Sequence, residues 1–247
     1  MLAVVGGSGL YTLGDEFHLR DQFSRQTPYG DTSADLLLGQ WGDVDVAFLP
    51  RHGAGHSVPP HAVNYRANVW LLKQAGVDRV IAVNAVGGIR DDMAPGVLSL
   101  PTQLIDYTSG REHSFFDGSD GVVRHADFSS PYSDELRALL LRAADRSGFG
   151  LVDSGTYGCT NGPRFETAAE IERMRRDGCS VVGMTGMLEA ALARELEIDY
   201  ACLALVVNWA AGVGDDDISM EEIMAVLQQG VERIRPLLLE AARLQDQ

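Results

Sequence analysis

The strongest constraint on the fold is an almost uninterrupted apolar run at residues 200–207, which ends at Asn208. A strand with one solvated face alternates polar and apolar residues, whereas a continuous run of this length is typical of a parallel strand that is covered on both faces. A short strand ending at 181–182, a turn at 184–186 and a helix at 188–196 precede the run. This strand–helix–strand order predicts an α/β protein.

The rest of the chain continues the alternation without an internal repeat, a low-complexity region or a linker. We therefore expect one domain over residues 1–247, with a mixed central sheet flanked by helices. A polar stretch at 108–131 is long for a loop, which predicts a role in function or assembly. The other expected elements are a hairpin of strands at 33–39 and 44–49, strands at 1–5, 79–83, 97–100, 103–107 and 151–157, and helices at 63–74, 134–147, 167–176 and from Ser219 onward.

Charge and composition exclude several classes of partner. The net charge of −15 argues against nucleic acid and anionic membrane surfaces as partners. No apolar run approaches the length of a membrane span, and the first residues do not resemble a signal peptide, so we expect a cytoplasmic protein. The three cysteines lack metal-ligand spacing, which predicts reduced, mostly buried thiols and no metal site.

Three strand-to-turn junctions carry groups suited to an anion. The first strand runs into a glycine turn that contains Ser8, and the strand at 79–83 runs into Asn84-Ala85 and two glycines. Backbone N–H groups in such turns bind phosphate, and so does the N-terminus of a helix, where Thr185 is placed. The first glycine turn alone also fits an ordinary tight turn, because it does not continue into a dinucleotide-binding fingerprint.

A compact group of basic residues follows the strand at 44–49. Arg51, His52 and His56 lie in a loop rich in Gly and Pro at the end of that strand. Arginine offers a fork of donors that matches phosphate, and histidine adds a second donor, so the loop predicts a cationic anion-binding cluster. A solvated surface loop is the alternative.

Candidates for binding a flat heterocycle lie at two other strand ends. Asn208 directly follows the apolar run, where open α/β sheets place ligands, and we expect it to face a heterocycle. Phe165 and Glu166 lie before a helix that Thr167 and Glu170 open with a capping box. Phe165 suits stacking on a flat ring and Glu166 suits a bond to base or ribose. A core Phe beside a surface Arg164–Glu166 pair is the alternative.

Six segments in the same order resemble the trimeric purine nucleoside phosphorylase family, and within it the 5′-methylthioadenosine phosphorylase branch. They are GGSGL at 6–10, TPYG at 27–30, RHGAGH at 51–56, VNYRAN at 63–68, NGPRFET at 161–167 and GMTGMLEAALARE at 183–195. The resemblance implies phosphate-dependent cleavage of a 5′-modified purine nucleoside, a homotrimer, and no metal or organic cofactor, with inorganic phosphate as co-substrate.

The resemblance also implies roles for individual residues. It places phosphate against Ser8, Arg51, His52, the Asn84–Ala85 turn and Thr185. It places Met184 under the ribose, Phe165 and Glu166 beside the base, and Asn208, Trp209 and Ala210 at the purine edge. For a 5′-methylthio group the candidates are Ile218, Ser219 and Met220, and a loop near His125 of a neighbouring subunit.

One departure from the family predicts the substrate. Adenine-specific members carry an Asp-aromatic-Asp pattern where this chain has Asn208-Trp209-Ala210. A carboxylate only accepts hydrogen bonds, whereas an amide both donates and accepts, so Asn208 suits a 6-oxo group and N7–H. We therefore expect cleavage of S-methyl-5′-thioinosine to hypoxanthine and 5-methylthioribose 1-phosphate. Asn84, where adenine-specific relatives tend to carry Thr, is a second departure.

Three alternatives remain open from the sequence. One is a phosphorylase of the same family that acts on 5′-methylthioadenosine or on inosine and guanosine. The second is a nucleosidase of similar fold that uses water, although Arg51 and His52 favour phosphate. The third is a nucleoside-binding protein without catalytic activity.

Overall fold

The computed structural model describes residues 1–118, 121–214 and 218–245, and it confirms the α/β class with a mixed central sheet. The strands are β1 (Leu2–Gly6), β2 (Phe17–Phe23), β3 (Gln26–Thr27), β4 (Gly30–Asp31), β5 (Leu36–Trp41), β6 (Val44–Pro50), β7 (Arg79–Gly88), β8 (Leu98–Ser99), β9 (Gln103–Asp106), β10 (Thr156–Cys159), β11 (Val181–Gly183) and β12 (Asp199–Trp209). The helices are α1 (Tyr65–Gln74), α2 (Asp134–Ser147), α3 (Ala168–Arg176), α4 (Gly186–Glu195) and α5 (Met220–Leu244), with short 3₁₀ turns η1 (Ala54–His56) and η2 (Pro60–Ala62).

The sheet is built around β7. Its path runs β2-β5-β6-β1-β7-β11-β10-β9, and β12 pairs in parallel along most of β7. The pairs β1–β6, β1–β7, β9–β10 and β10–β11 are also parallel, whereas β5–β6, β2–β5 and β7–β11 are antiparallel. The carboxyl ends of the parallel strands meet at one edge, which is where open α/β sheets bind ligands.

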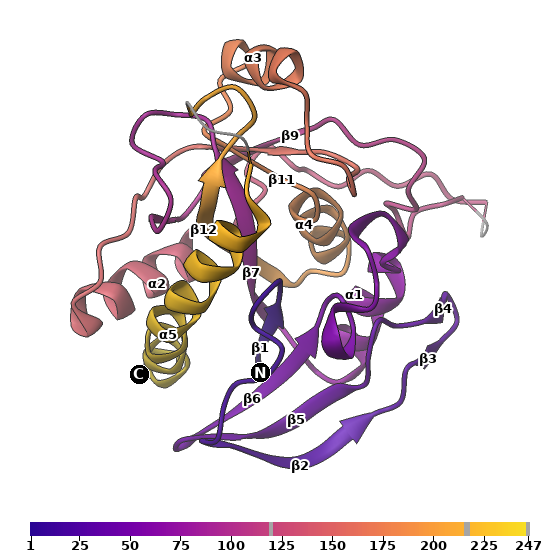
Figure 1. Cartoon of the computed structure of the whole chain (residues 1–247). Helices are drawn as coiled ribbons and strands as arrows, with labels where there is room; N and C mark the ends of the chain where they lie inside the picture. The colour runs from indigo at the N-terminus through magenta and orange to yellow at the C-terminus, as the bar shows by residue number, and fades with distance from the viewer. Residues whose placement is uncertain (119–120, 215–217, 246–247) are drawn as a thin grey trace.

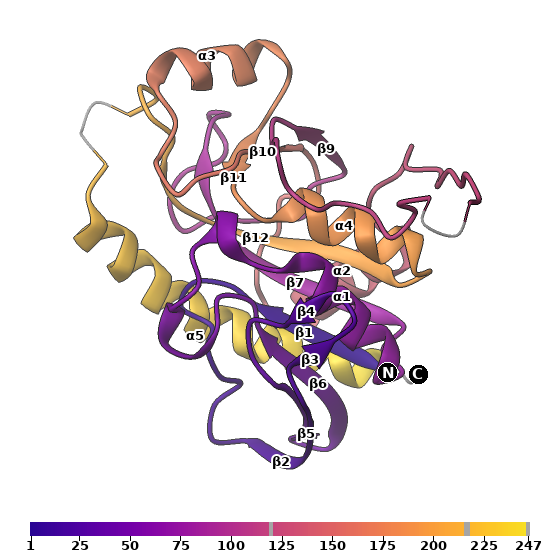
Figure 2. The same cartoon turned by 90° about the vertical axis from the view of Figure 1, so that its right-hand side faces the viewer.

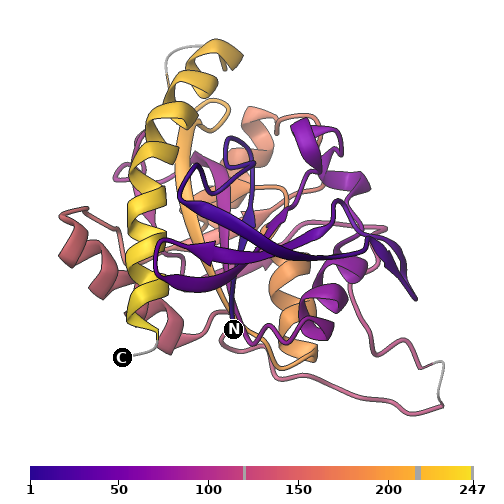
Figure 3. The same cartoon turned by 90° about the horizontal axis from the view of Figure 1, so that it is seen from below.

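Helices cover both faces of the sheet, as the apolar run of β12 predicts. Ala201, Leu203 and Leu205 face one core with α2 and α5, while Tyr200 and Cys202 face another with α1 and α4. Figures 1 and 3 show α2 and α5 on one side of β7 and β12, with α1 and α4 on the other. Alternate residues of one strand therefore enter two separate cores, which leaves no polar face along 200–207.

Local signals set the helix boundaries. Thr167 and Glu170 form both bonds of a capping box at the start of α3, as predicted. At the start of α5, the Ser219 hydroxyl oxygen accepts a hydrogen bond from the Glu222 N–H. The reciprocal bond of a capping box, from the Ser219 N–H to the Glu222 side chain, is absent among the described contacts. Figure 2 shows α3 standing apart from the other helices, above β10 and β11, and its buried residues Ile171 and Met174 belong to a small core cluster with Val182 of β11.

Three parts of the expected strand pattern are wrong. The turn expected at Asn84-Ala85 and the two glycines after them does not form, because the strand that was expected to end at 83 continues to Gly88 as β7 and stays paired with β12. The strand expected at 151–157 starts only at Thr156, because Val152 makes a single bridge to Ser99 before the chain reaches the sheet. The first strand of the expected hairpin lies at Leu36–Trp41 rather than at 33–39. The seven-residue β2 was not predicted, because it is an edge strand whose side chains are largely exposed and polar.

The end of β12 departs from regular pairing, and this departure shapes the site. The register against β7 shifts between Val206 and Asn208, so Val207 is the extra residue of a bulge. Beyond it, the Ala210 N–H still donates to the Gly88 carbonyl at 2.9 Å. The bulge re-aims the last residues of the strand, which is a common use of this feature beside binding sites.

Candidate active site

A cavity of about 600 Å³ lies at the carboxyl edge of the sheet. It gathers residues from the loops that follow β1 and β6, from β7, β11 and β12, and from the first turns of α5, although these are far apart in the sequence. Of the predicted site residues, those that line it are Ser8, Arg51, His52, Ala85, Phe165, Glu166, Met184, Thr185, Asn208 and Ala210. Asn84 and Trp209 are not among the described residues that line it.

Arg51 is the charged group of the deep end, and its side chain is 1% exposed. Its Nε and Nη2 donate to the Glu189 carboxylate, and its Nη1 donates to the Val83 carbonyl at 3.0 Å. Three of the five guanidinium N–H bonds are thus used, which leaves one on each terminal nitrogen. Because Glu189 occupies the side of the guanidinium formed by Nε and Nη2, the donors left for an anion are the remaining N–H bonds of the two terminal nitrogens, Nη1 and Nη2.

Glu189 is a site residue that the sequence reasoning missed. Its carboxylate also accepts from the Tyr200 hydroxyl at 2.9 Å, so three donors hold it in the core. Burial alone would lower the pKa of Arg51, but the charge and hydrogen bonds of Glu189 raise it above its ordinary value. A signal was present, since a Glu at 189 interrupts the apolar face of a helix, and buried carboxylates are rare unless they are paired.

Thr185 presents its hydroxyl to the cavity from the start of α4. It is the N-cap residue of α4, and its side chain makes no capping bond, so the hydroxyl is not used by the helix that it precedes. Asn84 donates from Nδ2 to the Thr185 hydroxyl oxygen at 2.7 Å, and Cys202 lies 3.4 Å from the Asn84 Oδ1. With its oxygen already accepting, the Thr185 hydroxyl is left to donate to an anion.

Glycine is required where the first turn passes Arg51. A Cβ at Gly7 would lie 2.4 Å from the Val83 carbonyl oxygen and 2.8 Å from Nη1 of Arg51. Gly9 has φ of 83°, which disfavours other residues. The turn is tight, as one of the two interpretations predicts, and it brings Ser8 to the cavity wall, where binding of an anion stays a prediction.

The two histidines do not form the cationic cluster that the sequence predicted. Burial, reinforced by the Arg51 charge, lowers the pKa of His52 to about 3, and burial also lowers the pKa of His56. His52 Nδ1 lies 2.9 Å from the Val58 carbonyl oxygen, so a neutral ring carries its proton there and its other nitrogen is an acceptor. The ring centroids of His52 and His56 lie 4.5 Å apart, with the ring planes tilted by 39°. Arg51 alone supplies the positive charge of this loop.

Asn208 and Ala210 face the opposite end of the cavity. The strand bulge places both on the cavity wall, while Trp209 between them packs against Gly214. Asn208 Nδ2 donates to the Trp209 carbonyl at 2.7 Å, which fixes the amide and leaves its second N–H and its Oδ1 available. One donor and one acceptor therefore face the cavity, next to an alanine that offers neither.

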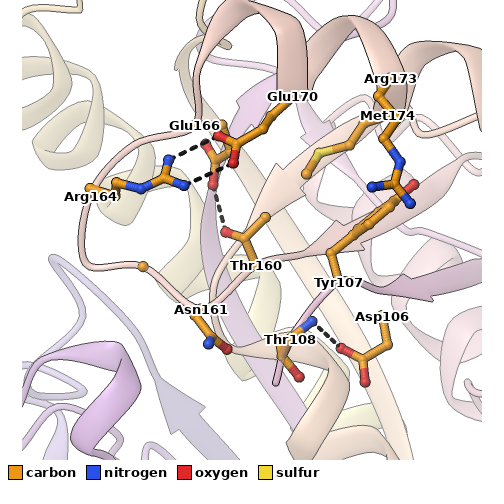
Figure 4. A pocket seen from close by; sticks show the side chains of 11 residues that line it. Asp106, Tyr107, Thr108, Thr160, Asn161, Arg164, Glu166, Glu170, Arg173 and Met174 are labelled. Carbon is orange, nitrogen blue, oxygen red and sulfur yellow. Dashed lines mark hydrogen bonds and ion pairs between the residues drawn. The ribbon is translucent and has the colours of Figure 1, made fainter. Parts of the chain in front are cut away.

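Phe165 and Glu166 come from the loop before α3. Phe165 is 41% exposed, so it is not the core residue of the alternative interpretation. Glu166 accepts from the Thr160 hydroxyl, and Arg164 instead pairs with Glu170, as Figure 4 shows. Glu166 lines both the main cavity and a second, polar one of about 570 Å³ behind this loop. Its second carboxylate oxygen is left to accept a bond.

An apolar wall completes the cavity on the side of α5. Its members are Tyr11, Ile218, Met220, Ile223, Met224 and Leu227. Of the predicted 5′-group candidates, Ile218 and Met220 lie here, whereas Ser219 caps the helix. The candidate loop near His125 belongs to a neighbouring subunit and stays a prediction. This end is open, since Met224 is 51% exposed. It can bury a small apolar group without offering it a hydrogen bond.

A family comparison fits this geometry. The model of the phosphorylase superfamily matches residues 2–243. The chain belongs to the phosphorylase superfamily. The predicted relationship to nucleoside phosphorylases is thereby confirmed.

Similar proteins cover nearly the whole phosphorylase chain. A protein of Pseudomonas syringae pv. tomato, named a probable S-methyl-5′-thioinosine phosphorylase, is 51% identical, with 96% of each chain covered. The 6-oxopurine nucleoside phosphorylase of Pyrococcus furiosus is 46% identical over 98% of this chain and 92% of its own. The methylthioadenosine phosphorylase of Schistosoma mansoni in complex with adenine has a TM-score of 0.93 at 31% identity, covering 99% of this chain and 91% of that one.

Two further features of the chain concern ions and membranes. In the described parts of this phosphorylase, no three His, Cys, Asp or Glu side chains lie together in a way that suits a metal ion. None of its described helices combines the length and apolar character needed to span a bilayer. The three cysteines are buried and unpaired, as predicted.

Proposed function

We propose that this enzyme catalyses the reversible phosphorolysis of S-methyl-5′-thioinosine to hypoxanthine and 5-methylthioribose 1-phosphate. The observation that carries the proposal is a single cavity with anion-binding groups at its buried end and the Asn208 amide at its other end. The relatives named for S-methyl-5′-thioinosine and for 6-oxopurine nucleosides support the same substrate class.

Phosphate binds at the deep end. The two free N–H bonds of Arg51, the hydroxyls of Ser8 and Thr185, and the N-terminus of α4 hold it beside C1′ of the sugar. The neutral His52 ring accepts a hydrogen bond from the P–O–H group of hydrogen phosphate. A fully ionised phosphate has no such donor and does not make this bond. Asn84 acts through Thr185 rather than on phosphate. The wall formed by Ala85 closes the site.

The purine lies between Asn208 and Glu166, with Phe165 against its face and Met184 beneath the ribose. A 6-oxopurine carries an oxygen at C6 and a proton on N1. Asn208 donates to the oxygen and accepts from N7–H, while the free oxygen of Glu166 accepts from N1–H. Adenine has no N1 proton and brings an amino group to a wall where Ala210 offers no acceptor. Each unmet bond costs about 1–3 kcal/mol, which favours the 6-oxopurine.

The reaction needs no covalent intermediate on the protein. A phosphate oxygen attacks C1′ as the bond to N9 breaks, so positive charge grows on the sugar and negative charge on the base. Fixing phosphate next to C1′ supplies proximity and electrostatic stabilisation. Asn208 stabilises the departing base, but an amide gives up no proton near neutral pH, so water supplies the proton to N7. The proposed chemistry uses no metal or organic cofactor.

The apolar wall at α5 supports a methylthio substrate over inosine. Ile223, Met224 and Leu227 bury a CH₃S group without leaving a polar atom unpaired, whereas the 5′-hydroxyl of inosine loses its water there. Binding by a non-catalytic protein is disfavoured, because such a protein has no need of a phosphate cup that is continuous with the purine cavity.

Product analysis tests the proposal. S-methyl-5′-thioinosine, 5′-methylthioadenosine and inosine are each incubated with the enzyme, with and without phosphate. We expect rapid, phosphate-dependent release of hypoxanthine from S-methyl-5′-thioinosine and slower release of base from the other two. Equal release without phosphate identifies a nucleosidase, and binding without turnover identifies a binding protein.

The remaining parts of the proposal concern the cell and the assembly. We infer a cytoplasmic homotrimer with a role in purine salvage, and the family resemblance supports this. Light scattering on the eluting protein measures the trimer directly, and a monomer of full activity contradicts it.

A further inference from the structure

Arg111 lies in the long 108–131 segment, which the proposed site does not use. Its guanidinium donates from Nη1 to the Met184 carbonyl at 2.9 Å and from Nη2 to the Asn161 carbonyl. Met184 belongs to the turn between β11 and α4, and Asn161 begins the loop that leads to Phe165 and Glu166. One side chain thus holds the two loops on which the proposal places ribose and base.

The backbone explains why a double donor is needed at this point. β10 and β11 run in parallel up to Cys159 and Gly183, and the Thr160 N–H still donates to the Gly183 carbonyl at 2.9 Å. One residue further, Asn161 and Met184 both present carbonyl oxygens, and two acceptors cannot bond to each other. The Arg111 fork satisfies both oxygens, which a single-point donor such as lysine cannot do as well.

The two loops are also packed tightly against each other. A Cβ at Gly162 would lie 2.3 Å from Sδ of Met184, so a small change in the separation of the loops moves Met184. Asn161 is additionally held by Ser109, whose N–H donates to its Oδ1 at 3.2 Å and whose carbonyl accepts from its Nδ2 at 3.0 Å. The segment therefore meets the base loop at two positions, Ser109 and Arg111.

Arg111 rests on a rigid support. Its guanidinium lies over the ring of Tyr65, 5.5 Å from the centroid. Tyr65 is buried, and its hydroxyl donates to the Pro60 carbonyl at 2.9 Å, so the same unit reaches the loop that follows His56. Among the described residues, no carboxylate lies within ion-pair distance of Arg111, which leaves the two loop carbonyls and the Tyr65 ring as its partners.

We propose that Arg111 is a positioning residue that sets the spacing between the ribose turn at Met184 and the base loop at 161–166. The proposal rests on the proposed function for the identity of the ligand parts. The phosphate end does not depend on Arg111, because Asn84 holds Thr185 and Glu189 holds Arg51. Loss of Arg111 therefore weakens nucleoside binding selectively.

Arg66 provides a matched control. It also lies over a tyrosine, 4.8 Å from the Tyr29 centroid, and donates to a backbone carbonyl, that of Ser114 at 3.4 Å. It anchors the same segment to α1 but touches neither site loop. If the effect comes from loosening the 108–131 segment, it appears on substitution of either Arg66 or Arg111. If it comes from loss of the Arg111 bonds to the Met184 and Asn161 carbonyls, it appears only on substitution of Arg111.

The test compares Arg111→Met, Arg111→Lys and Arg66→Met by steady-state kinetics with S-methyl-5′-thioinosine and phosphate. We expect Arg111→Met to raise the nucleoside KM about tenfold, since two bonds from a charged donor are lost, with phosphate KM within about twofold. Arg111→Lys is expected between wild type and Arg111→Met, and Arg66→Met near wild type. Equal effects at 66 and 111, a parallel rise of phosphate KM, or a wild-type Arg111→Lys overturns the proposal.

Hydrogen exchange gives a readout that does not depend on the substrate. In Arg111→Met, amide exchange at 159–167 and at 183–185 is expected to rise together, while exchange in α4 and in the Arg66→Met protein stays unchanged. Unaltered exchange in both loops overturns the proposal that Arg111 holds them together. If the wild-type enzyme cleaves no nucleoside, the proposed function fails, and exchange alone then decides whether Arg111 holds the loops.

Discussion

The two ends of the cavity are built in opposite ways. At the phosphate end, Arg51, Asn84 and Thr185 are buried and bonded to groups of the core, so their geometry is fixed by the sheet. At the nucleoside end, Phe165 and Met224 come from a loop and a helix start and are about half exposed. The contrast indicates that the part common to all substrates is formed by the core, whereas the walls proposed for the face of the base and for the 5′ group lie where sequence change is tolerated.

The largest expected effect is at the core-built end. In the double variant Arg51→Gln with Glu189→Gln, two amides replace the buried ion pair, and the Tyr200 hydroxyl keeps an acceptor. The charge facing phosphate is lost, so we expect kcat/KM for phosphate to fall by roughly 10³. Phosphate-dependent rates and thermal unfolding of the same samples measure it.

The single variants are the control for that experiment. Each leaves one buried charge without its partner, and breaking a buried pair costs about 3–5 kcal/mol, so each is expected to be less stable than the double variant. A double variant that keeps wild-type phosphate kinetics removes Arg51 from the phosphate site and makes the pair purely structural.

At the phosphate end, the sequence predicted which residues line the cavity better than it predicted which side chains pair with one another. The strand-end positions of Ser8 and Thr185 followed from a glycine turn and an apolar run, which are local signals, whereas Ala85 lies inside β7 and not in the predicted turn. The pairing of Arg51 with Glu189 joins residues 138 positions apart, and a local pattern cannot register it. The neutral state of His52 follows from burial, which only the folded chain creates.

At the nucleoside end, a one-residue irregularity limited the prediction. The apolar run predicted where β12 ends, and Asn208 and Ala210 line the cavity. Strict alternation beyond the strand would put neighbouring residues on opposite faces, and it is the bulge at Val207 that decides which face each takes. Trp209 points elsewhere for this reason. The roles of these residues in binding stay predictions until the variants are measured.

The second effect in size concerns the selective end. Asn208→Asp replaces a donor and acceptor by an acceptor alone, which suits the 6-amino group of adenine. We expect the ratio of activity on 5′-methylthioadenosine to that on S-methyl-5′-thioinosine to rise about ten- to hundredfold, for bonds of about 1–3 kcal/mol. Competition between the two substrates in one reaction measures the ratio directly.

Asn208→Ala separates selectivity from general damage. It removes both functions of the amide and is expected to lower activity on both substrates without the reversal that Asp gives. An unchanged ratio in Asn208→Asp contradicts the role of this amide in reading the purine, while leaving the phosphate end as described.

A smaller effect is expected on the apolar wall. Met224→Ser exchanges apolar contact for a hydroxyl, at a cost of about 0.8 kcal/mol for each buried methylene that is lost. KM for S-methyl-5′-thioinosine is therefore expected to rise about fivefold, and KM for inosine to change less or to fall. Met224→Leu keeps the apolar volume and serves as control. If Met224→Ser changes KM by the same factor for both nucleosides, the 5′ group does not bind at the apolar wall.

The smallest effect tests how well the phosphate end excludes solvent. Burial first, then the charge of Arg51, lowers the pKa of His52 from 6.5 to about 3. Between these two values the unfolded chain binds a proton that the folded chain does not, so stability falls as pH falls through this window. From pH 7 to pH 5 the loss is expected to be about 1–2 kcal/mol. His52→Gln should remove it, and the surface variant His18→Gln should not, in urea unfolding at the two pH values. An identical pH dependence in wild type and His52→Gln means that water reaches this ring, and the division of the cavity into a sealed end and an open end then fails.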